Sequence, residues 1–362
     1  MHVRLLDMGM VSVLRSQSIY HGITQCMKAN SDPAISIMRP EATYVSTGYF
    51  QEVAREVDLE YCLENKIPVI RRHVGGGAVL LDANQLFFHV MLPAARAREF
   101  GLPLSLEERF ETLARPVVLA YHKLGVNASF RPINDIHVNG KKIGGTGVGE
   151  IDEGIVFAGS MMFDFDTALM ARVLRLPDEK MRDKVRAGMD TYMSTMKKEL
   201  ESLPKLEEVA EALLSSFEEI FGITLIPSMP TPDEMDAIYE WDNRLKSDSW
   251  MNEIRLKEKD GNQVKISNSV KIVQAMHKAP GGLIRGTMRV VDGVVDDVCI
   301  SGDFPMSPQD CLSRFSEKFV GVPFDKNEMK RRLESALNEL KPDMAGVDTG
   351  DFKQLLEQVT AS

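Results

Sequence analysis

The chain has 362 residues, of which 44% are hydrophobic and 27% charged, and its 43 Lys plus Arg against 53 Asp plus Glu give a formal net charge of −10. This length and composition are typical of a globular protein of about two domains with a sizeable core. The negative balance argues against a general nucleic-acid or anionic-membrane binder, although it leaves room for a local basic pocket for phosphate.

The cysteine pattern and the N-terminal residues indicate the cellular compartment in which we expect the protein. Cys26, Cys62, Cys299 and Cys311 form no C-x-x-C pair, which favours free thiols of a reducing compartment over a disulfide framework or a structural zinc site. The first residues lack the basic-then-apolar layout of a signal peptide, and no apolar run approaches the ~20 residues of a membrane span. We therefore expect a cytoplasmic protein that binds no membrane.

The first part of the chain mixes strand-like and helix-like stretches. Short apolar or alternating runs predict strands at residues 34–38, 43–46, 67–70, 77–81 and 87–92. Apolar residues at helical spacing predict helices at residues 52–65, 106–124 and 204–221. Ser105 with Glu108 forms a capping box at the start of the second helix, Pro116 predicts a kink or break within it, and Gly222 ends the third.

A change of composition suggests a domain boundary. Residues 226–232 contain three prolines, which predicts a linker between a domain at 1–225 and a second domain at 226–362. We expect the second domain to hold a β-rich stretch and two helices. One of these helices opens at Ser307-Pro308, and the other opens at Asp325 with Glu328 three residues later.

The most unusual segment runs from Arg71 to Asp82, where two arginines lead into three consecutive glycines before a predicted strand. Glycines without Cβ allow backbone N–H groups to approach an anion closely, and an adjacent guanidinium can clamp a phosphate or carboxylate. The alternative interpretation is a β-turn with an exposed arginine pair. Because three glycines cost chain entropy on folding, we favour a functional role.

The second unusual segment runs from Asn134 to Gly147. Asn139-Gly140 is a strong signal for a type I′ hairpin turn. A lysine between an Asn-Asp pair and a glycine cluster could neutralise phosphate charge, and Asp135 could hold Mg²⁺, which prefers oxygen ligands. The alternative is a solvated hairpin tip with two ordinary lysines.

Other patterns exclude competing sites. Residues 145–149 contain glycines, but they match neither a P-loop nor the spacing of a dinucleotide-binding turn. The seven histidines form no zinc-ligand spacing, and there is no G-x-S-x-G.

Taken together and in this order, the two unusual segments resemble lipoate–protein ligases of the biotin/lipoate ligase superfamily. That family carries R-R-x-S-G-G-G-A-V-x-H-D and then N-D…G-x-K-[IV]-x-G, which residues 71–82 and 134–145 match in most positions. Residues 48–51, 56–58 and 159–162 add weaker agreement, so the resemblance covers about residues 1–225. Residues 281–285 and 300–304 resemble the accessory domain that some of these ligases carry. The chain departs from the pattern at Val74, Leu81 and Ala158, where the family has Ser, His and His.

The resemblance implies an α+β fold of mixed β-sheets with flanking helices, plus a small α/β accessory domain. It implies that ATP, with Mg²⁺, activates lipoate or octanoate as an acyl-adenylate, and that a lysine of an acceptor protein then takes the acyl group. Lys142 would be catalytic, and Asp135 would hold Mg²⁺. The remaining substrate- and nucleotide-binding residues would be Arg71, Arg72, Val74, Gly75, Gly76, Gly77, Ala78, Val79, Asp82, Gln85, Asn134, Asp135, Gly145, Gly159 and Ser160.

Three rival functions stay open. Octanoyltransferases of the superfamily form an acyl-cysteine, but no cysteine lies between Cys62 and Cys299. Biotin ligases are the second rival, but their loop is richer in alternating glycine and arginine than the G-G-G-A-V of residues 75–79. A non-catalytic protein that binds an acyl group or an acyl carrier is the third. The acceptor could be a 2-oxoacid dehydrogenase lipoyl domain, a glycine-cleavage H protein or the lipoate-binding protein of a sulfur-oxidation system; no nucleic acid is expected as a partner.

Overall fold

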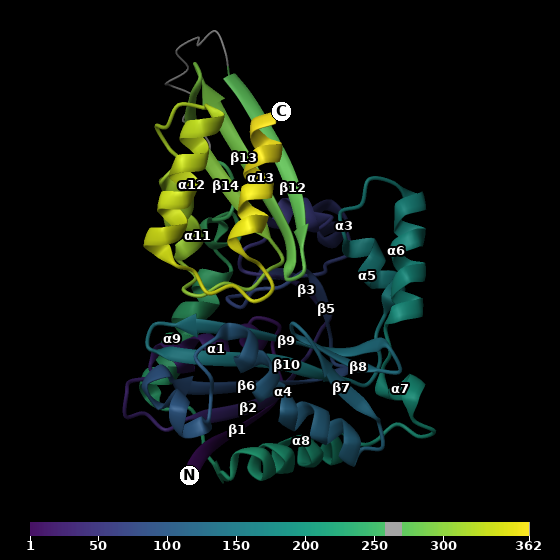
Figure 1. Ribbon diagram of the computed structural model, residues 1–362. Coiled ribbons are helices and arrows are strands. Elements are labelled where there is room, and N and C mark those ends of the chain that lie inside the picture. The colour runs from purple at the N-terminus through teal and green to yellow at the C-terminus, as the bar shows by residue number, and fades with distance from the viewer. Residues whose placement is uncertain (258–269, 362) are drawn as a thin grey trace.

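The structure of the protein is a computed structural model that describes residues 1–257 and 270–361. It contains a large sheet with helices on both faces, a small sheet beside it and a separate C-terminal sheet with its own helices (Figure 1). The predicted fold class is confirmed. Among the described residues, no helix has both the length and the apolar character that crossing a membrane requires.

The large sheet has eight strands. In spatial order they are β11 (Thr224–Pro227), β1 (His2–Val11), β2 (Ala34–Pro40), β6 (Gln85–Pro93), β10 (Gly154–Met162), β9 (Lys141–Ile151), β8 (Asp135–Val138) and β7 (Ala128–Arg131). Strand β1 runs parallel to both of its neighbours, and all other pairs are antiparallel. Asn139 and Gly140 both have positive φ between β8 and β9, so the predicted hairpin is confirmed.

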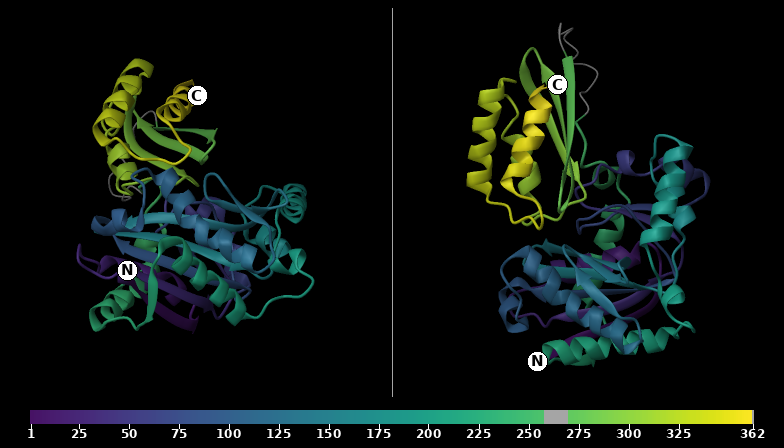
Figure 2. Two further views of the ribbon diagram at one scale, coloured as in Figure 1. Left: turned by 60° about the horizontal axis from the view of Figure 1, so that its bottom comes forward. Right: turned by 45° about the vertical axis from the view of Figure 1, so that its right-hand side comes forward.

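One face of this sheet is covered by α4 (Leu106–Lys123) and α8 (Leu206–Phe221), which lie on the side away from the C-terminal sheet (Figure 2). Phe88 and Val90 of β6 are buried on this face. Their position follows from the alternation of side chains along a strand. This face and the two helices form the main hydrophobic core.

The opposite face carries α1 (Arg15–Gln25), and α9 (Pro232–Leu245) packs along α1. Phe87 and Met91, which alternate with Phe88 and Val90, are buried on this side. Helix α1 covers only part of the face, so the remainder of β6, β9 and β10 is available to line a cavity.

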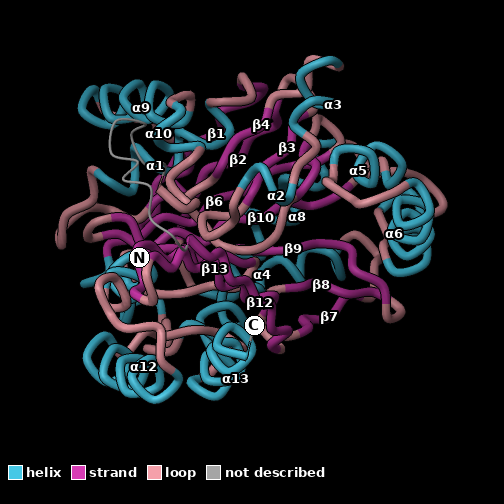
Figure 3. Tube along the Cα trace, turned by 90° about the horizontal axis from the view of Figure 1, so that it is seen from above, coloured by secondary structure: helices cyan, strands magenta, loops and turns pink. Residues whose placement is uncertain are grey.

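A three-stranded sheet stands beside the uncovered part of that face. Strand β3 (Tyr44–Thr47) lies between β4 (Val69–Arg71) and β5 (Val79–Leu81), and the chain between β4 and β5 contains the three glycines. Around this sheet lie α2 (Val53–Glu56), α3 (Leu59–Glu64), α5 (Thr167–Val173) and α6 (Glu179–Tyr192) (Figure 3). Three short helical segments complete the first part: the 3-10 helix Ala94–Phe100, α7 (Met196–Glu199) and α10 (Asp248–Met251).

The local helix signals are partly confirmed. Ser105 accepts a hydrogen bond from the Glu108 N–H and caps α4, and Gly222 has φ +60° at the end of α8. The prediction of one helix over 52–65 was wrong, because the chain is extended at Val57 and the Asp58 side chain caps a new helix. Pro116 does not break α4, because the helix buries an apolar face whose packing outweighs one missing hydrogen bond.

The C-terminal sheet is antiparallel, with strands β12 (Val270–Ala279), β13 (Gly282–Val291) and β14 (Val294–Gly302). Helices α11 (Cys311–Glu317), α12 (Lys326–Leu340) and α13 (Thr349–Ala361) pack on it around a separate core. Asp325 caps α12 by accepting from the N–H groups of Asn327 and Glu328, as predicted. The expected start at Ser307 was wrong: the helix begins at Cys311, and Ser307 instead donates to Glu150 Oε2 at 2.7 Å.

The division into domains at residue 225 stays a prediction. Two structural facts bear on it: β11 crosses this position as an edge strand of the large sheet, and α9 packs on α1. The core of the C-terminal sheet is formed by residues from Val273 onward, together with Phe50. We propose two units, with residues 226–257 packed on the first.

Phe88 tests the main core. We expect Phe88→Ala to lower the free energy of unfolding by about 3–5 kcal/mol, because Phe88 is fully buried and its truncation leaves a cavity. Urea unfolding followed by the fluorescence of Trp241 and Trp250 measures the change. Leu63, which is 81% exposed, is the control, and Leu63→Ala should change stability by less than about 0.5 kcal/mol. Equal effects of the two substitutions would contradict the assignment of the core.

Candidate functional site

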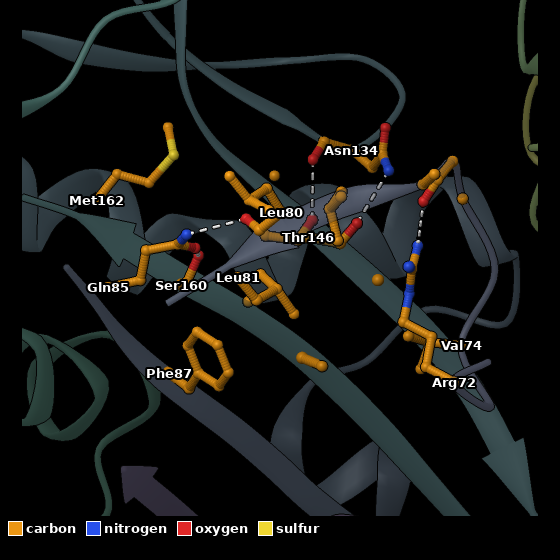
Figure 4. A pocket seen from close by; sticks show the side chains of 18 of the residues that line it. Arg72, Val74, Leu80, Leu81, Gln85, Phe87, Asn134, Thr146, Ser160 and Met162 are labelled. Atoms are coloured by element: carbon orange, nitrogen blue, oxygen red, sulfur yellow. Dashed lines mark hydrogen bonds between the residues drawn. The ribbon is translucent and has the colours of Figure 1, made fainter. Parts of the chain in front are cut away.

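A cavity of about 280 Å³ lies between the uncovered part of the large sheet and the chain that connects β4 to β5 (Figure 4). The residues predicted for the site line it, with three exceptions. Those that line it are Arg72, Val74, Gly75, Gly76, Gly77, Ala78, Val79, Gln85, Asn134, Lys142, Gly145, Gly159 and Ser160. Arg71, Asp82 and Asp135 are not among the lining residues.

The glycine loop, residues 74–78, is held by Arg72. The Arg72 guanidinium donates to the carbonyl oxygens of Ser46 at 2.9 Å, Gly75 at 2.8 Å and Gly77 at 2.9 Å. Burial lowers the pKa of Arg72 to about 10, which leaves it charged at neutral pH. Arg72 therefore fixes the shape of the loop through its backbone carbonyl groups and does not present these donors to a ligand.

The N–H groups of the three glycines have no partner among the described residues. No acceptor in residues 1–257 or 270–361 takes a hydrogen bond from the N–H of Gly75, Gly76 or Gly77. Gly76 has φ +95°, a conformation that other residues rarely adopt. Successive free N–H groups in such a loop are suited to binding an anion.

Gly48 explains why the loop can lie so close to β3. A Cβ at Gly48 would lie 1.8 Å from the carbonyl oxygen of Gly76. Any larger residue at this position would push the loop out of the arrangement that Arg72 holds. The agreement at Gly48 with the family pattern thus has a steric reason.

Arg71 lies away from the cavity. It donates to the carbonyl oxygens of Tyr49 at 2.6 Å and Trp250 at 2.9 Å, pairs with Glu253, and stacks on the rings of Tyr49 and Trp250. Adjacent residues of an extended chain point to opposite sides, so the two arginines diverge. Arg71 anchors the segment that follows α9 and supports the loop from behind.

Lys142 and Asp135 come together from neighbouring strands. Lys142 Nζ lies 2.6 Å from Asp135 Oδ1, and both side chains are partly exposed. A Cβ at Gly145 would lie 3.2 Å from Lys142 Nζ, so glycine there leaves room for the ammonium group. Asp135 holds Lys142 beside the cavity although it does not line the cavity itself.

The other predicted polar residues have local partners. Asn134 donates to the carbonyl oxygen of Thr146 at 2.9 Å (Figure 4). Gln85 accepts from the Ser160 hydroxyl at 2.9 Å. Asp82 accepts from the N–H of Asn84 at 2.8 Å, which shapes the turn into β6. Asp82 thus has a structural role in this arrangement.

Several lining residues were missed by sequence reasoning. They are Gln17, Tyr20, Leu80, Leu81, Phe87, His89, Thr146, Gly147, Ala158, Met162, Phe165, Met170, Met189 and Met193. The alternation along β6 could have indicated Phe87 and His89, because both share a face with Gln85. Met189 and Met193 come from α6 and the residue that follows it, and no sequence signal placed them at this cavity.

The C-terminal unit touches the glycine loop. A Cβ at Gly75 would lie 3.1 Å from the carbonyl oxygen of Phe304, and the rings of Phe304 and Phe50 stack with centroids 5.5 Å apart. Gln309 donates to the carbonyl oxygen of His73, immediately before the loop. A side chain at position 75 would therefore press on the backbone of the C-terminal unit, which would have to shift slightly to admit it.

Comparison with known families agrees with this geometry. Residues 14–218 match the family described as the lipoyl protein ligase A/B catalytic domain, and residues 272–356 match the bacterial lipoate protein ligase C-terminus. The first match covers more than half of the chain. The chain belongs to the lipoyl protein ligase A/B family.

Its relatives include two kinds of enzyme. Over 310 residues the chain is 26% identical to the lipoate-protein ligase LplJ of Bacillus subtilis, covering 85% of this chain and 86% of that protein. It is 28% identical to the lipoate-protein ligase A subunit 1 of Thermoplasma acidophilum, over 57% of this chain and 79% of that one. It is also 26% identical to the octanoyltransferase LipM of Kyrpidia tusciae, over 60% and 86%. The family membership thus does not by itself distinguish ligase from transferase.

Solved structures show the same fold. A chain from the bipartite lipoate protein ligase system of Thermoplasma acidophilum, described together with its E2 lipoyl domain, is 27% identical with a TM-score of 0.63, covering 71% of this chain and 99% of that chain. P. falciparum LipL1, solved in complex with lipoate, has a TM-score of 0.70 over 99% of this chain and 100% of that one, at 14% identity. The latter likeness concerns the fold alone.

Buried histidines beside the site predict a dependence of stability on pH. Burial lowers the pKa of His89 to about 3, from an ordinary value of about 6.5 in the unfolded chain. Between these values the unfolded state binds a proton that the folded state does not. The contribution of His89 is therefore fully present above pH 6.5 and is lost as the pH falls towards 3.

We expect His89→Leu to make stability less sensitive to pH, by about 1.4 kcal/mol per pH unit between pH 5.5 and 4.5. Urea unfolding of wild type and variant at several pH values measures both slopes, and comparing slopes removes any constant loss from the substitution. Equal slopes would show that His89 titrates alike in both states.

Proposed function

We propose that this protein is an ATP-dependent lipoate–protein ligase. It activates the carboxylate of lipoate, or of octanoate, as an acyl-adenylate and transfers the acyl group to a lysine of an acceptor protein. The observation that carries the proposal is the glycine loop next to Lys142 at the cavity: Arg72 binds the carbonyl groups of Gly75 and Gly77, and no described residue accepts from the N–H groups of the three glycines. Such an arrangement suits a phosphate or a mixed anhydride.

The first step forms the adenylate. A carboxylate oxygen of the acid attacks the α-phosphorus of ATP, and the bond to the β-phosphate oxygen breaks so that pyrophosphate leaves. Negative charge increases on the oxygens around the α-phosphorus in the transition state. Lys142 and the N–H groups of Gly75 to Gly77 would stabilise that charge, because fixed donors in a partly dry site need little reorganisation.

Asp135 would position Lys142 before the substrates bind, through the 2.6 Å ion pair. Among the described residues, no cluster of three His, Cys, Asp or Glu side chains could hold a metal ion. A Mg²⁺ that arrives with the nucleotide keeps waters and phosphate oxygens as ligands and needs only one protein carboxylate. Asp135 would supply that carboxylate, and the ion would neutralise phosphate charge.

The second step transfers the acyl group. The amine of the acceptor lysine attacks the carbonyl carbon of the adenylate, the bond to the phosphate oxygen breaks, AMP leaves with the electron pair, and the nitrogen loses a proton. The adenylate is hydrolysed by water, so the apolar lining of the cavity protects it. Val74, Ala78 and Val79 contribute to this lining.

The nucleotide would bind towards Gln85, Ser160, Asn134 and Gly145, where amide, hydroxyl and exposed backbone groups lie around the cavity. Glycine at position 159 also has a steric reason, because a Cβ there would lie 2.5 Å from the Phe88 ring. Arg71 and Asp82 are proposed as supporting residues, for the contacts given above.

Because octanoyltransferases are among the relatives, acyl transfer through a cysteine is the main alternative. None of the four cysteines lines the cavity. Burial raises the pKa of Cys62 to about 11 and that of Cys299 to about 12, so neither is a reactive thiolate at neutral pH. These observations favour the adenylate route.

The acceptor is proposed to be a lipoyl-type domain with a modifiable lysine. The relative from Thermoplasma acidophilum was described with its E2 lipoyl domain, which supports this class of partner. Incubation of candidate acceptors with the protein, ATP, Mg²⁺ and each acid, followed by intact-mass measurement, identifies the acceptor. An acyl mass gained without ATP would favour the transferase instead.

Lys142 tests the proposal most directly. We expect wild type to catalyse ATP–pyrophosphate exchange that depends on lipoate or octanoate, and Lys142→Ala to lower it by about 10²–10³-fold through loss of charge stabilisation. Lys141→Ala is the matched control, because Lys141 is the exposed neighbour and does not line the cavity; it should retain exchange. Circular dichroism and thermal unfolding check that both variants fold.

No exchange by the intact wild-type protein would reject the ligase proposal. Near-normal exchange by a folded Lys142→Ala protein would show that the catalytic role belongs to another residue.

A further inference from the structure

The cavity has a closed end and an open end. His89, Tyr20 and Gln17 at one end are all less than 5% exposed. At the other end Gly75, Gly76 and Gly77 of the loop, Lys142 and Met193 are partly exposed. An acceptor lysine can reach only the open end, so the activated carboxyl group must lie there and the acyl tail must extend towards His89.

The spacing of the strands fits this orientation. Lys142 lies against Gly145 of β9, and the next residue, Thr146, pairs with Gly159 of β10, whereas His89 of β6 pairs with Ala158 of β10. Gly145 and His89 are therefore two strands apart and offset by two residues along the strands. With ordinary strand dimensions this is about 12 Å, which is suited to an extended medium-chain acid.

The closed end is polar, and most of its polar groups satisfy one another. The Tyr20 hydroxyl donates to Gln17 Oε1 at 3.2 Å, and Gln17 Nε2 donates to the Tyr44 hydroxyl at 2.7 Å. His89 Nδ1 shares a hydrogen bond with Ser36 Oγ at 3.0 Å.

His89 Nε2 is the exception. No described residue forms a hydrogen bond with it, although the His89 side chain lines the cavity. The low pKa of His89 keeps the ring neutral, so each nitrogen is either a donor or an acceptor. A purely hydrocarbon tail would remove water from this nitrogen and offer no replacement, which is unfavourable.

We propose that His89 determines specificity for the acid, through a hydrogen bond between Nε2 and a heteroatom at the far end of the acyl chain. The inference rests on the proposed function and adds to it the choice between the two acids. Lipoate ends in two sulfur atoms, which are weak hydrogen-bond partners, whereas octanoate ends in a methyl group. The site therefore favours lipoate, because a site built around a polar group discriminates against the analogue that lacks its partner.

Two measurements on the full-length protein test this. Calorimetric binding of lipoate and of octanoate without ATP gives a ratio of affinities, and acid-dependent pyrophosphate exchange gives a ratio of kcat/KM. We expect wild type to favour lipoate by at least about fivefold in both, and His89→Leu to reduce that preference to near unity. His89→Gln, which keeps a hydrogen-bonding amide, should retain part of it.

His21→Leu is the matched control. His21 is also buried, contacts the same Tyr20 ring and has an unpartnered Nε2, but it does not line the cavity. We expect His21→Leu to lower stability without changing the ratio of acids.

Four results would overturn the inference: wild type binding octanoate as tightly as lipoate, His89→Leu keeping the wild-type ratio, His21→Leu changing the ratio equally, or His89→Leu raising the KM for ATP rather than for the acid. The ratio of lipoate to octanoate affinity in the wild type tests the inference even if a variant fails to fold. Lipoate binding without any exchange would reject the ligase reaction and leave the role of His89 to be judged from binding alone.

Discussion

The site depends on one buried charge, the guanidinium of Arg72. A buried arginine normally pairs with a carboxylate, because removing the charge from water is costly. Arg72 instead donates to three backbone carbonyl groups, one from β3 and two from the glycine loop. These bonds offset the desolvation and simultaneously fix which groups of the loop remain free. The carbonyl groups of Gly75 and Gly77 are bound to the protein, and the N–H groups of the three glycines are left for the proposed anion.

The large sheet supplies the other half of the site through simple alternation. Phe88 and Val90 fill the core under β6, so Gln85, Phe87 and His89 must lie on the opposite face. A shift of one residue in the pairing of β6 would bury His89 in the main core and expose Phe88 to the cavity. The register with β2 and β10 therefore determines the lining of the cavity as well as the packing of the core.

Sequence patterns indicated the residue types around the cavity better than the arrangement of those residues in space. The glycine loop and the Asn139-Gly140 hairpin have local signals, because only certain residues allow those backbone conformations. Lys142 was indicated by its place between an Asn-Asp pair and a glycine cluster. The divergence of Arg71 and Arg72 was harder to see, since it depends on Trp250, far along the chain. Met189 and Met193 follow from the packing of α6 beside the cavity, and no local pattern records that packing. The start of α11 was misplaced because Ser307 contacts Glu150 instead of capping a helix.

The glycine loop is shaped by three separate parts of the chain. Ser46 of β3 and Arg72 hold it from one side, Gly48 allows its close approach, and the backbone at Phe304 lies against Gly75 on the other side. The Phe50–Phe304 stack and the hydrogen bond from Gln309 to His73 keep the C-terminal unit at this place. A displacement of that unit would remove one wall of the loop while the Arg72 contacts stayed intact. The proposed anion binding by the loop and the position of the C-terminal unit are therefore physically linked, because both act on the same few backbone atoms.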